Sequence, residues 1–293
     1  MQLSSTTEVA RADRRASRRR VSGQRISQGV MHVVLLAMAF LALAPFIWSI
    51  FASFKPFKEL VSTQDLLPHT WTLNSYNEIF ARAHFLDAAR NSVIAAVSVT
   101  VATLLTSSAV GYVFAKYRFW GKDLLFTILL STLMVPFSVL LIPLYIRIAD
   151  LGLSNSLGGI IVTGLWSTFG IFMMRQFMET IPFDLLDAAR IDGASEWRIF
   201  LQIVVPLATA PMAALGVFTF LGNWDSYLWP LVVLNSPEKQ TIPLMLAGLR
   251  SLYWTRYDMW SAGSMLTVVP VMLIYAFASK WFIRGIAMTG IKG

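Results

Sequence analysis

The chain has 293 residues, of which 56% are hydrophobic and 14% are charged, whereas a soluble domain carries about 25% charged residues. The few charges lie between apolar segments that exceed the roughly 20 residues needed to cross a membrane as a helix, so the composition excludes an ordinary soluble domain and predicts an integral membrane protein. The absence of cysteine excludes disulfides, thiolate metal sites and cysteine nucleophiles.

A basic segment, residues 1–29, begins the chain and is followed directly by an apolar run. Seven of the 24 lysines and arginines lie in this segment, within "RADRRASRRRVSGQR". Such a tail beside a first membrane span marks the cytoplasmic side and contacts membrane lipid, so we expect no nucleic-acid partner. The apolar run continues past the cleavage-like Ala42-Leu43-Ala44 to Phe54, which is too long for a cleaved signal peptide. We therefore predict an uncleaved first span.

Six segments are long and apolar enough to cross a membrane. They are residues 30–54, 91–115, 124–147, 157–177, 207–234 and 259–281. With the basic tail in the cytoplasm, 16 of the 24 lysines and arginines fall on that side and eight on the other, as the positive-inside rule predicts. The predicted fold is therefore all-α: a polytopic membrane protein with six transmembrane helices over residues 30–284, both termini cytoplasmic, and a C-terminal tail of residues 285–293.

Two regions of the first half carry local signals. In the outer segment 55–90, Thr72 and Asn74 precede "YNEIFARAHFL", which predicts a helix that lies along the outer interface. In the third span, Pro136 and Pro143 each remove a backbone donor. We predict that these two prolines kink a helix that lines a gate.

A polar hairpin of about residues 178–206 separates the fourth and fifth spans. Pro182 suits the first turn of a helix, and Gly193 suits its end because glycine accepts a positive φ. Ser195 can cap a second helix, "EWRIFLQIVV", and Pro206 marks the return to the membrane. The sequence thus predicts two short helices on the cytoplasmic side.

The first helix of this hairpin places acidic and small residues together. Asp184, Asp187 and Ile191 share one side, with Ala188 and Ala189 nearby, so a cationic partner could approach the backbone closely. The residues expected to anchor the second helix against the membrane helices are Trp197, Ile199 and Phe200. The residues alone leave a second interpretation open, a solvated loop whose charges keep it out of the lipid.

The fifth span contains the only acidic residue inside a predicted span, Asp225 in "FLGNWDSYLWPL". If the span ends at Leu234, Asp225 lies roughly 13 Å inside it, at about 1.5 Å per residue. A hydrogen-bonding and aromatic wall for a polyhydroxylated solute could consist of Asn223, Trp224, Asp225, Tyr227 and Trp229. An outer aromatic belt, broken at Pro230 with Asp225 already in water, explains the same residues, and both interpretations stay open.

The hairpin sequence "LLDAARIDGASEWRIFLQIVVP" resembles the EAA signature of ABC importer permeases. Residues 187–189 fill its leading triplet, Gly193 its glycine, Ile203 its apolar position and Pro206 its proline. The leading residue is Asp rather than Glu, one methylene shorter. Four further stretches resemble carbohydrate-uptake permeases of the maltose-transporter type: "RFWGKDLLF", "LMVPFSVLLIPLYI", "NWDSYLWPL" and the terminal "GIAMTGIKG". The last of these resembles the tail of the maltose permease G subunit.

This resemblance implies a permease subunit of an ATP-driven, binding-protein-dependent importer in a bacterial cell membrane. The implied solute is a disaccharide, an oligosaccharide or a related polar solute such as glycerol 3-phosphate, and the implied partners are a second homologous permease, two ATPase subunits and an extracytoplasmic substrate-binding protein. The residues implied to couple to the ATPase are Asp187, Ala188, Ala189, Asp192, Gly193, Ala194 and Ser195, together with the C-terminal Lys292 and Gly293. The chain itself is expected to need no cofactor, because ATP and Mg are expected on the partner ATPase.

The sequence also lacks the pattern of a phosphate-binding loop, which argues against ATP hydrolysis by this chain. Its only Gly-Lys pair, Gly121-Lys122, is followed by Asp123, and Lys116 stands where a phosphate-binding loop has its first glycine. We therefore expect a non-catalytic membrane subunit.

Other functions are less consistent with the residues. The Asp-Gly pattern of membrane phosphatidyltransferases fails, because Glu196-Trp197 stands where Ala-Arg should follow. No metal site is expected, since ligand spacing is lacking among His32, His69 and His84. A stand-alone carrier or channel that uses Asp225 remains the alternative to an importer subunit.

Overall fold

The computed structural model describes residues 3–250 and 255–289, and helices are the regular elements of this part, apart from one isolated bridge between Arg250 and Thr255. The first eight helices are α1 (Leu3–Ser53), α2 (Phe57–Ser62), α3 (Asn74–Arg82), α4 (Phe85–Lys116), α5 (Lys122–Ser131), α6 (Phe137–Asp150), α7 (Leu157–Thr163) and α8 (Thr168–Glu179). The others are α9 (Phe183–Ile191), α10 (Glu196–Ile199), α11 (Val205–Leu207), α12 (Thr209–Trp224), α13 (Leu228–Val233), α14 (Ile242–Gly248) and α15 (Tyr257–Thr289). Two 3₁₀ turns, Thr132–Met134 and Pro237–Lys239, and one π-helical segment, Phe200–Val204, complete the described elements. The all-α prediction is confirmed.

Three helices are by themselves long and apolar enough to cross a membrane. They are α1 over Gln28–Ser53, α4 over Phe85–Lys116 and α15 over Tyr257–Ala276, which agree with the first, second and sixth predicted spans. Helix α1 already begins at Leu3, so the basic segment and the first span form one continuous helix. The helix predicted in the outer segment is α3, where the Thr72 hydroxyl accepts a hydrogen bond from the Asn74 amide at 3.1 Å.

The other three predicted spans are not straight helices. The third bends by 101° between Lys122–Met134 and Phe137–Asp150, and the fourth bends by 41° between Leu157–Thr163 and Thr168–Glu179. Six spans therefore result only if each bent pair of helices counts as one.

The fifth predicted span, residues 207–234, is wrong as a single helix. Helix α12 ends at Trp224, and the short α13 follows it as a separate helix. At its other end, α12 meets the Glu196–Leu207 segment at a bend of 76°. The break at residues 225–227 precedes Pro230, so the proline is the third residue of α13 rather than the breaking residue.

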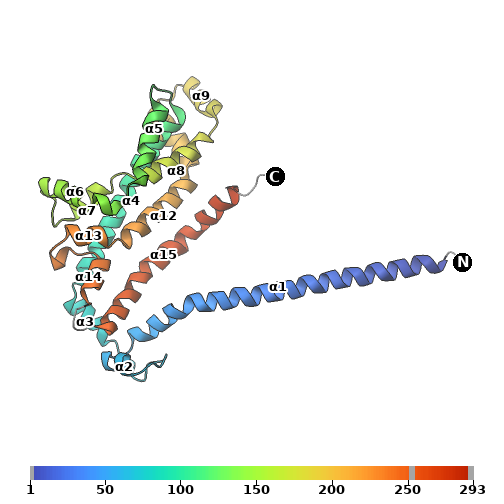
Figure 1. Cartoon of the computed structure of the whole chain (residues 1–293). Helices are drawn as coiled ribbons and strands as arrows, with labels where there is room; N and C mark the ends of the chain where they lie inside the picture. The colour runs from blue at the N-terminus through green and yellow to red at the C-terminus, as the bar shows by residue number, and fades with distance from the viewer. Residues whose placement is uncertain (1–2, 251–254, 290–293) are drawn as a thin grey trace.

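Helix α4 runs through the length of the helical bundle, with α8 and α12 beside it (Figure 1). The α9 hairpin and the start of α5 lie at one end, and α2, α3 and α14 lie toward the other (Figure 1). Small residues allow α4 and α8 to approach: a Cβ added at Gly111 would lie 2.8 Å from the Met174 Cβ. Close approach at small residues is typical of membrane helices, which gain little from the hydrophobic effect between them.

Candidate coupling hairpin and membrane cavities

The hairpin between α8 and α12 forms as the local signals predict. Pro182 precedes α9 with φ −60°, and Gly193 follows it in the left-handed region with φ +78°. The Gly193 amide donates to the Arg190 carbonyl at 3.0 Å, and the Ala194 amide donates to the Ala189 carbonyl at 3.0 Å. These bonds satisfy the last carbonyls of α9, as glycine-ended helices do.

The second helix of the hairpin, α10, begins at its predicted cap and is followed by a wider, π-helical turn. The Ser195 hydroxyl accepts a hydrogen bond from the Arg198 amide, and after one turn of α10 the chain forms the π-helical segment Phe200–Val204. Pro206 has no N–H to donate to the carbonyl four residues earlier, which is consistent with a widened turn before it. The π turn was not predicted, because no residue type by itself signals one.

Apolar side chains hold the hairpin against the membrane helices. Leu186 of α9 and Ile199 of α10 are fully buried, in a cluster with Tyr112 of α4 and Met174 of α8. Phe200 is also buried in this cluster, so two of the three predicted anchors are confirmed.

The third predicted anchor, Trp197, is wrong, because its side chain is 72% exposed. At about 100° per residue, Ile199 and Phe200 share a face of the helix, whereas Trp197 lies about 200° away from Ile199. Its ring makes an edge-to-face contact with Phe200, with centroids 6.3 Å apart.

The opposite face of α9 is open to solvent. Asp184, Asp187, Ala188 and Ile191 are exposed there, and Ile191 is 87% exposed. Of the other residues singled out for coupling, Asp192, Gly193 and Ser195 are exposed, and Ala189 and Ala194 are half-buried. The exposed Ile191 therefore lies among acidic and small residues on this face.

Charged groups join the two helices of the hairpin. The Arg190 guanidinium donates to Asp187 Oδ1 at 2.6 Å and to Glu196 Oε1 at 2.8 Å. The hydrogen bond to Glu196, and after it the one to Asp187, raises the pKa of Arg190, so this side chain stays cationic at neutral pH. The leading acid of the EAA-like triplet is thus paired within its own helix.

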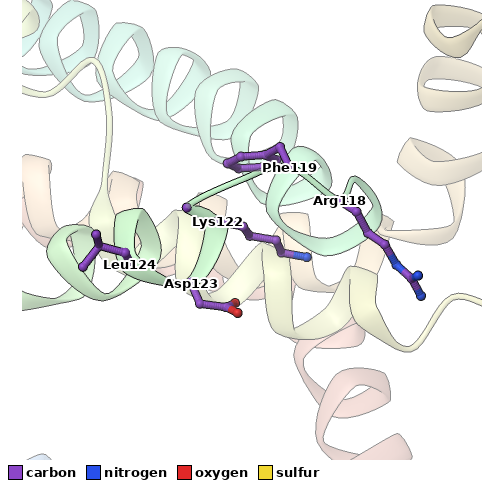
Figure 2. Close-up of a pocket in the computed structure, with 6 residues that line it drawn as sticks. Arg118, Phe119, Lys122, Asp123 and Leu124 are labelled. Carbon is purple, nitrogen blue, oxygen red and sulfur yellow. The ribbon is translucent and has the colours of Figure 1, made fainter.

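A basic turn lies at the same end of the molecule, between α4 and α5. A surface cavity of about 410 Å³ is lined by Arg118, Phe119, Gly121, Lys122, Asp123 and Leu124. The side chains of Arg118 and Lys122 extend to one side of the turn, whereas Leu124 points away from them (Figure 2). Gly121 adopts φ +77° as the residue before α5, a conformation that glycine accepts without strain and that suits the turn between the two helices.

Two adjoining cavities lie where the bent helices break. One, of about 280 Å³, is lined by Val99, Thr103, Gly164, Trp166, Ser167, Phe169, Leu215, Phe218, Thr219, Gly222 and Asn223. The other, of about 330 Å³, is lined by Phe137, Ile160, Thr163, Gly164, Asn223, Ser226, Tyr227, Leu228 and Trp229. Gly164 and Asn223 border both, so residues from four membrane segments converge on one region.

Three of the five predicted pathway residues border these cavities. Asn223 does so near the end of α12, and Tyr227 does so in the break before α13. Trp229 does so with its ring largely buried and its indole N–H donating to the Gly159 carbonyl at 3.3 Å. The other two do not. Trp224 is 1% exposed and stacks on Phe220 in the core, and Asp225 is exposed in the break after α12.

The sequence reasoning missed the contribution of the fourth span. Trp166 and Ser167 lie in the break between α7 and α8 and line the first cavity. The signal was the "TGLWS" interruption of an apolar run, in which glycine and serine suit a turn.

The two prolines predicted to kink a gate helix, Pro136 and Pro143, lie at different positions relative to α6. Pro136 precedes α6 at the 101° bend, and its neighbour Phe137 lines the second cavity. Pro143 lies inside α6. The predicted kink is therefore a full break at Pro136. The two C-terminal residues predicted to reach the ATPase, Lys292 and Gly293, lie outside the described residues, and that contact stays a prediction.

Comparison with known proteins places the chain in a family. Residues 107–287 match the family described as "Binding-protein-dependent transport system inner membrane component". A curated relative, the arabinooligosaccharides transport system permease protein AraQ of Halalkalibacterium halodurans, is 38% identical over 260 residues, 87% of this chain and 93% of the relative. The lactose transport system permease protein LacG of Rhizobium radiobacter is 35% identical over 89% of this chain and 96% of its own length.

The fold also matches a solved structure. A chain of a bacterial ABC transporter involved in the import of the acidic polysaccharide alginate superposes with a TM-score of 0.79, over 88% of this chain and 97% of that chain. The two sequences are 23% identical, so this match supports the fold and not the solute.

Proposed function

The chain belongs to the inner membrane components of binding-protein-dependent transport systems, the permease subunits of ABC importers, and we propose that it imports a sugar of disaccharide or oligosaccharide size. As such a permease it is a non-catalytic, multi-pass component of the inner membrane. The relatives named for arabinooligosaccharides and for lactose support the solute class.

The observation that carries the proposal is the open face of α9. It presents Asp184, Asp187, Ala188 and Ile191 to solvent at one end of the bundle, while Leu186 fixes the helix from behind. In the proposal, two ATPase subunits that bind ATP and Mg dock on this face and on the matching face of a second permease. An extracytoplasmic binding protein delivers the solute at the other end.

The proposed topology counts each bent pair of helices as one span. It has six spans with α9 and both termini in the cytoplasm, and it is supported by the charge asymmetry of the sequence and by the place of α9 and α2 at opposite ends of the bundle (Figure 1). In this topology the two adjoining cavities lie within the membrane-spanning part and form the wall of this subunit's half of the solute pathway.

The lining of the cavities favours an uncharged solute. Ser167 and Asn223 supply hydrogen-bonding groups, and Trp166 and Tyr227 supply aromatic faces that suit sugar rings. Among the described residues that line the two cavities there is no Lys or Arg, so a sugar fits them better than glycerol 3-phosphate does. A carrier that uses Asp225 is less well supported, because Asp225 lines neither cavity.

A matched pair of glycine substitutions tests the coupling role. Gly193 has φ +78° and Gly152, in the turn after α6, has φ +70°, and a Cβ at either position would meet nothing within 4 Å. Leucine therefore strains the backbone equally at both, by about 1–2 kcal/mol. In vesicles that hold the whole importer, Gly193→Leu should abolish ATP-dependent uptake of a radiolabelled oligosaccharide, whereas Gly152→Leu should retain most of it. Equal uptake by the two variants would refute the docking of α9.

A further inference from the structure

Four polar side chains at the hairpin form a continuous line of hydrogen bonds across three elements. Asp187 and Arg190 belong to α9, Glu196 begins α10, and Tyr117 is the first residue after α4. Asp187 and Arg190 are one helical turn apart, whereas Tyr117 and Glu196 are 79 positions apart in the sequence. The line thus connects the exposed face of α9 with the end of a membrane helix.

The carboxylate of Glu196 is the centre of this line. Its Oε1 accepts from Arg190 Nε at 2.8 Å, and its Oε2 accepts from Arg190 Nη2 at 3.2 Å and from the Tyr117 hydroxyl at 2.6 Å. Arg190 therefore bridges the two arms of the hairpin across the Gly193 turn, and Tyr117 fastens the hairpin to α4. Burial, and then the hydrogen bond to Glu196, raises the pKa of Tyr117, so its hydroxyl remains a donor at neutral pH.

The apolar packing between α10 and α4 is incomplete. A groove of about 180 Å³ separates them, lined by Ala109, Tyr112, Val113, Tyr117, Glu196, Trp197 and Phe200. Apolar packing is also non-directional, so helices packed in this way can slide past each other. A hydrogen bond from Tyr117 to Glu196 has a preferred distance and angle, and it closes the rim of the groove.

The far part of α4 reaches the proposed solute pathway. Val99 and Thr103 line the cavity of about 280 Å³. Thr103 lies roughly 21 Å from Tyr117 along the axis of α4, at about 1.5 Å per residue. A pull on the Tyr117 end of this straight helix would therefore move one wall of the cavity.

We infer that Glu196 is a positioning residue of the transport cycle. Arg190 holds α9 to Glu196, and Glu196 transmits a displacement of α9 to α4 through its hydrogen bond with Tyr117. The inference rests on the proposed function, because it requires an ATPase docked on α9. It adds a directional hydrogen bond to the apolar packing of the hairpin against Tyr112 and Met174 and to the covalent connections through α8 and α12.

The chain offers a direct readout because it contains no cysteine. Thr219 lines the same cavity, and Thr219→Cys provides a single thiol there. Inside-out membrane vesicles containing the whole importer are treated with a membrane-impermeant maleimide, with and without a non-hydrolysable ATP analogue. In the parent Thr219→Cys chain, the analogue should slow labelling several-fold, because closure of the ATPase dimer turns the cavity away from the cytoplasm.

Tyr117→Phe in this background removes one hydroxyl and keeps the ring. The ATPase should still co-isolate with the chain, but the labelling rate should lose most of its response to the analogue. Glu196→Gln keeps an acceptor for Tyr117 and weakens the pairing with Arg190, so it should give an intermediate loss. The double variant should be no worse than Tyr117→Phe alone, because two residues in one path are not additive.

Tyr145→Phe is the matched control, because Tyr145 is a partly buried residue of α6 that packs against the cluster around Ile148, and its hydroxyl bonds to none of the described polar groups. It should keep the full response. A full response in Tyr117→Phe would overturn the inference, and so would an equal loss in both tyrosine variants. A parent chain that shows neither a bound ATPase nor any response to nucleotide would overturn the proposed function instead.

Discussion

At the residue scale, single carboxylates fix segments that have no regular structure. Glu59 of α2 accepts hydrogen bonds from the backbone amides of His69 at 2.8 Å and Thr70 at 3.2 Å. The buried Lys55 lies 3.9 Å from the Glu59 carboxylate and donates to the Asp65 carbonyl. These bonds, the one from the His69 amide above all, lower the pKa of Glu59. Glu59 and Lys55 thereby fix the outer loop to α2.

We predict that Glu59→Gln loosens this loop at neutral pH, because it leaves Lys55 without its counter-charge and weakens the acceptor for two amides. A carboxylate with a lowered pKa stabilises the fold above its ordinary pKa, about 4.3 for glutamate, and this contribution is lost as the pH falls through the lowered value. Hydrogen exchange of the His69 and Thr70 amides should therefore be faster in the variant at pH 7.

The same amides in the unsubstituted chain should lose their protection only in acid, below the ordinary glutamate pKa. Glu238→Gln is the control, since Glu238 is exposed and its carboxylate pairs with no described residue. Equal exchange in the two variants at pH 7 would contradict the role of Glu59.

At the element scale, the contacts of α4 with α8 and α12 determine how the membrane helices pack. The α4–α8 contact depends on small residues: a Cβ at Gly111 would lie 2.8 Å from the Met174 Cβ and 3.0 Å from the Arg175 amide nitrogen, which is backbone and cannot rotate away. A Cβ at Gly222 of α12 would meet nothing within 4 Å.

Gly111→Ala should therefore destabilise the subunit by about 1–3 kcal/mol through overpacking, although alanine favours the helix itself. Gly222→Ala should be neutral or slightly stabilising, since only the helix propensity changes, by at most about 1 kcal/mol. Thermal unfolding of the detergent-purified importer checks both. An unchanged midpoint for Gly111→Ala would mean that α4 and α8 can separate without cost.

A second prediction at this scale concerns the two prolines near α6. Val135 before Pro136 is extended, with φ −84° and ψ 115°, as residues before proline prefer. Pro136→Ala removes that restriction and lets α5 continue toward α6, so uptake should fall by about tenfold, or about 1.4 kcal/mol in the barrier.

Pro143→Ala leaves the bend in place and restores one backbone donor inside α6. Uptake should therefore change little. Initial rates of ATP-dependent uptake, compared at equal amounts of membrane-inserted chain, distinguish the two variants. A larger loss for Pro143→Ala would place the moving joint inside α6 rather than at its start.

At the scale of the whole molecule, much apolar surface faces outward. The most apolar stretch of 18 residues within Gln28–Ser53 has no residue buried against the rest of the chain, and α1 leaves the bundle at its α2 end and projects away from it (Figure 1). Large apolar side chains such as Leu41 at 75% and Leu124 at 65% exposure suit contact with lipid or with another membrane chain.

We predict that the subunit purifies from native membranes with a second permease, an ATPase and, on the outer side, a sugar-binding protein. Affinity capture in mild detergent followed by mass spectrometry of the bound chains checks this. If these chains are present in stoichiometric amounts, the solute can then be identified from the sugar bound to the captured binding protein. Capture of this chain alone or as a homo-oligomer would favour the carrier hypothesis.

The sequence by itself determined the features that arise within a few residues. Apolar length predicted the three straight candidate spans, α1, α4 and α15, and Pro182, Gly193 and Ser195 predicted the ends of the hairpin helices, because caps and positive-φ turns depend on local backbone chemistry. The EAA-like spacing likewise lies within one hairpin, and it led to the family that the comparisons confirm. These signals needed no knowledge of the packing.

Only the tertiary structure decided which side chains meet. Trp224 and Asp225 are neighbours in the sequence, yet the end of α12 buries the first in the core and leaves the second exposed. Helical periodicity could not predict this break, because it arises where α12 and α13 pack against different partners. The hydrogen bond from Tyr117 to Glu196 joins residues 79 positions apart. Contacts of this kind depend on how whole helices pack, and no local rule of the chain specifies them.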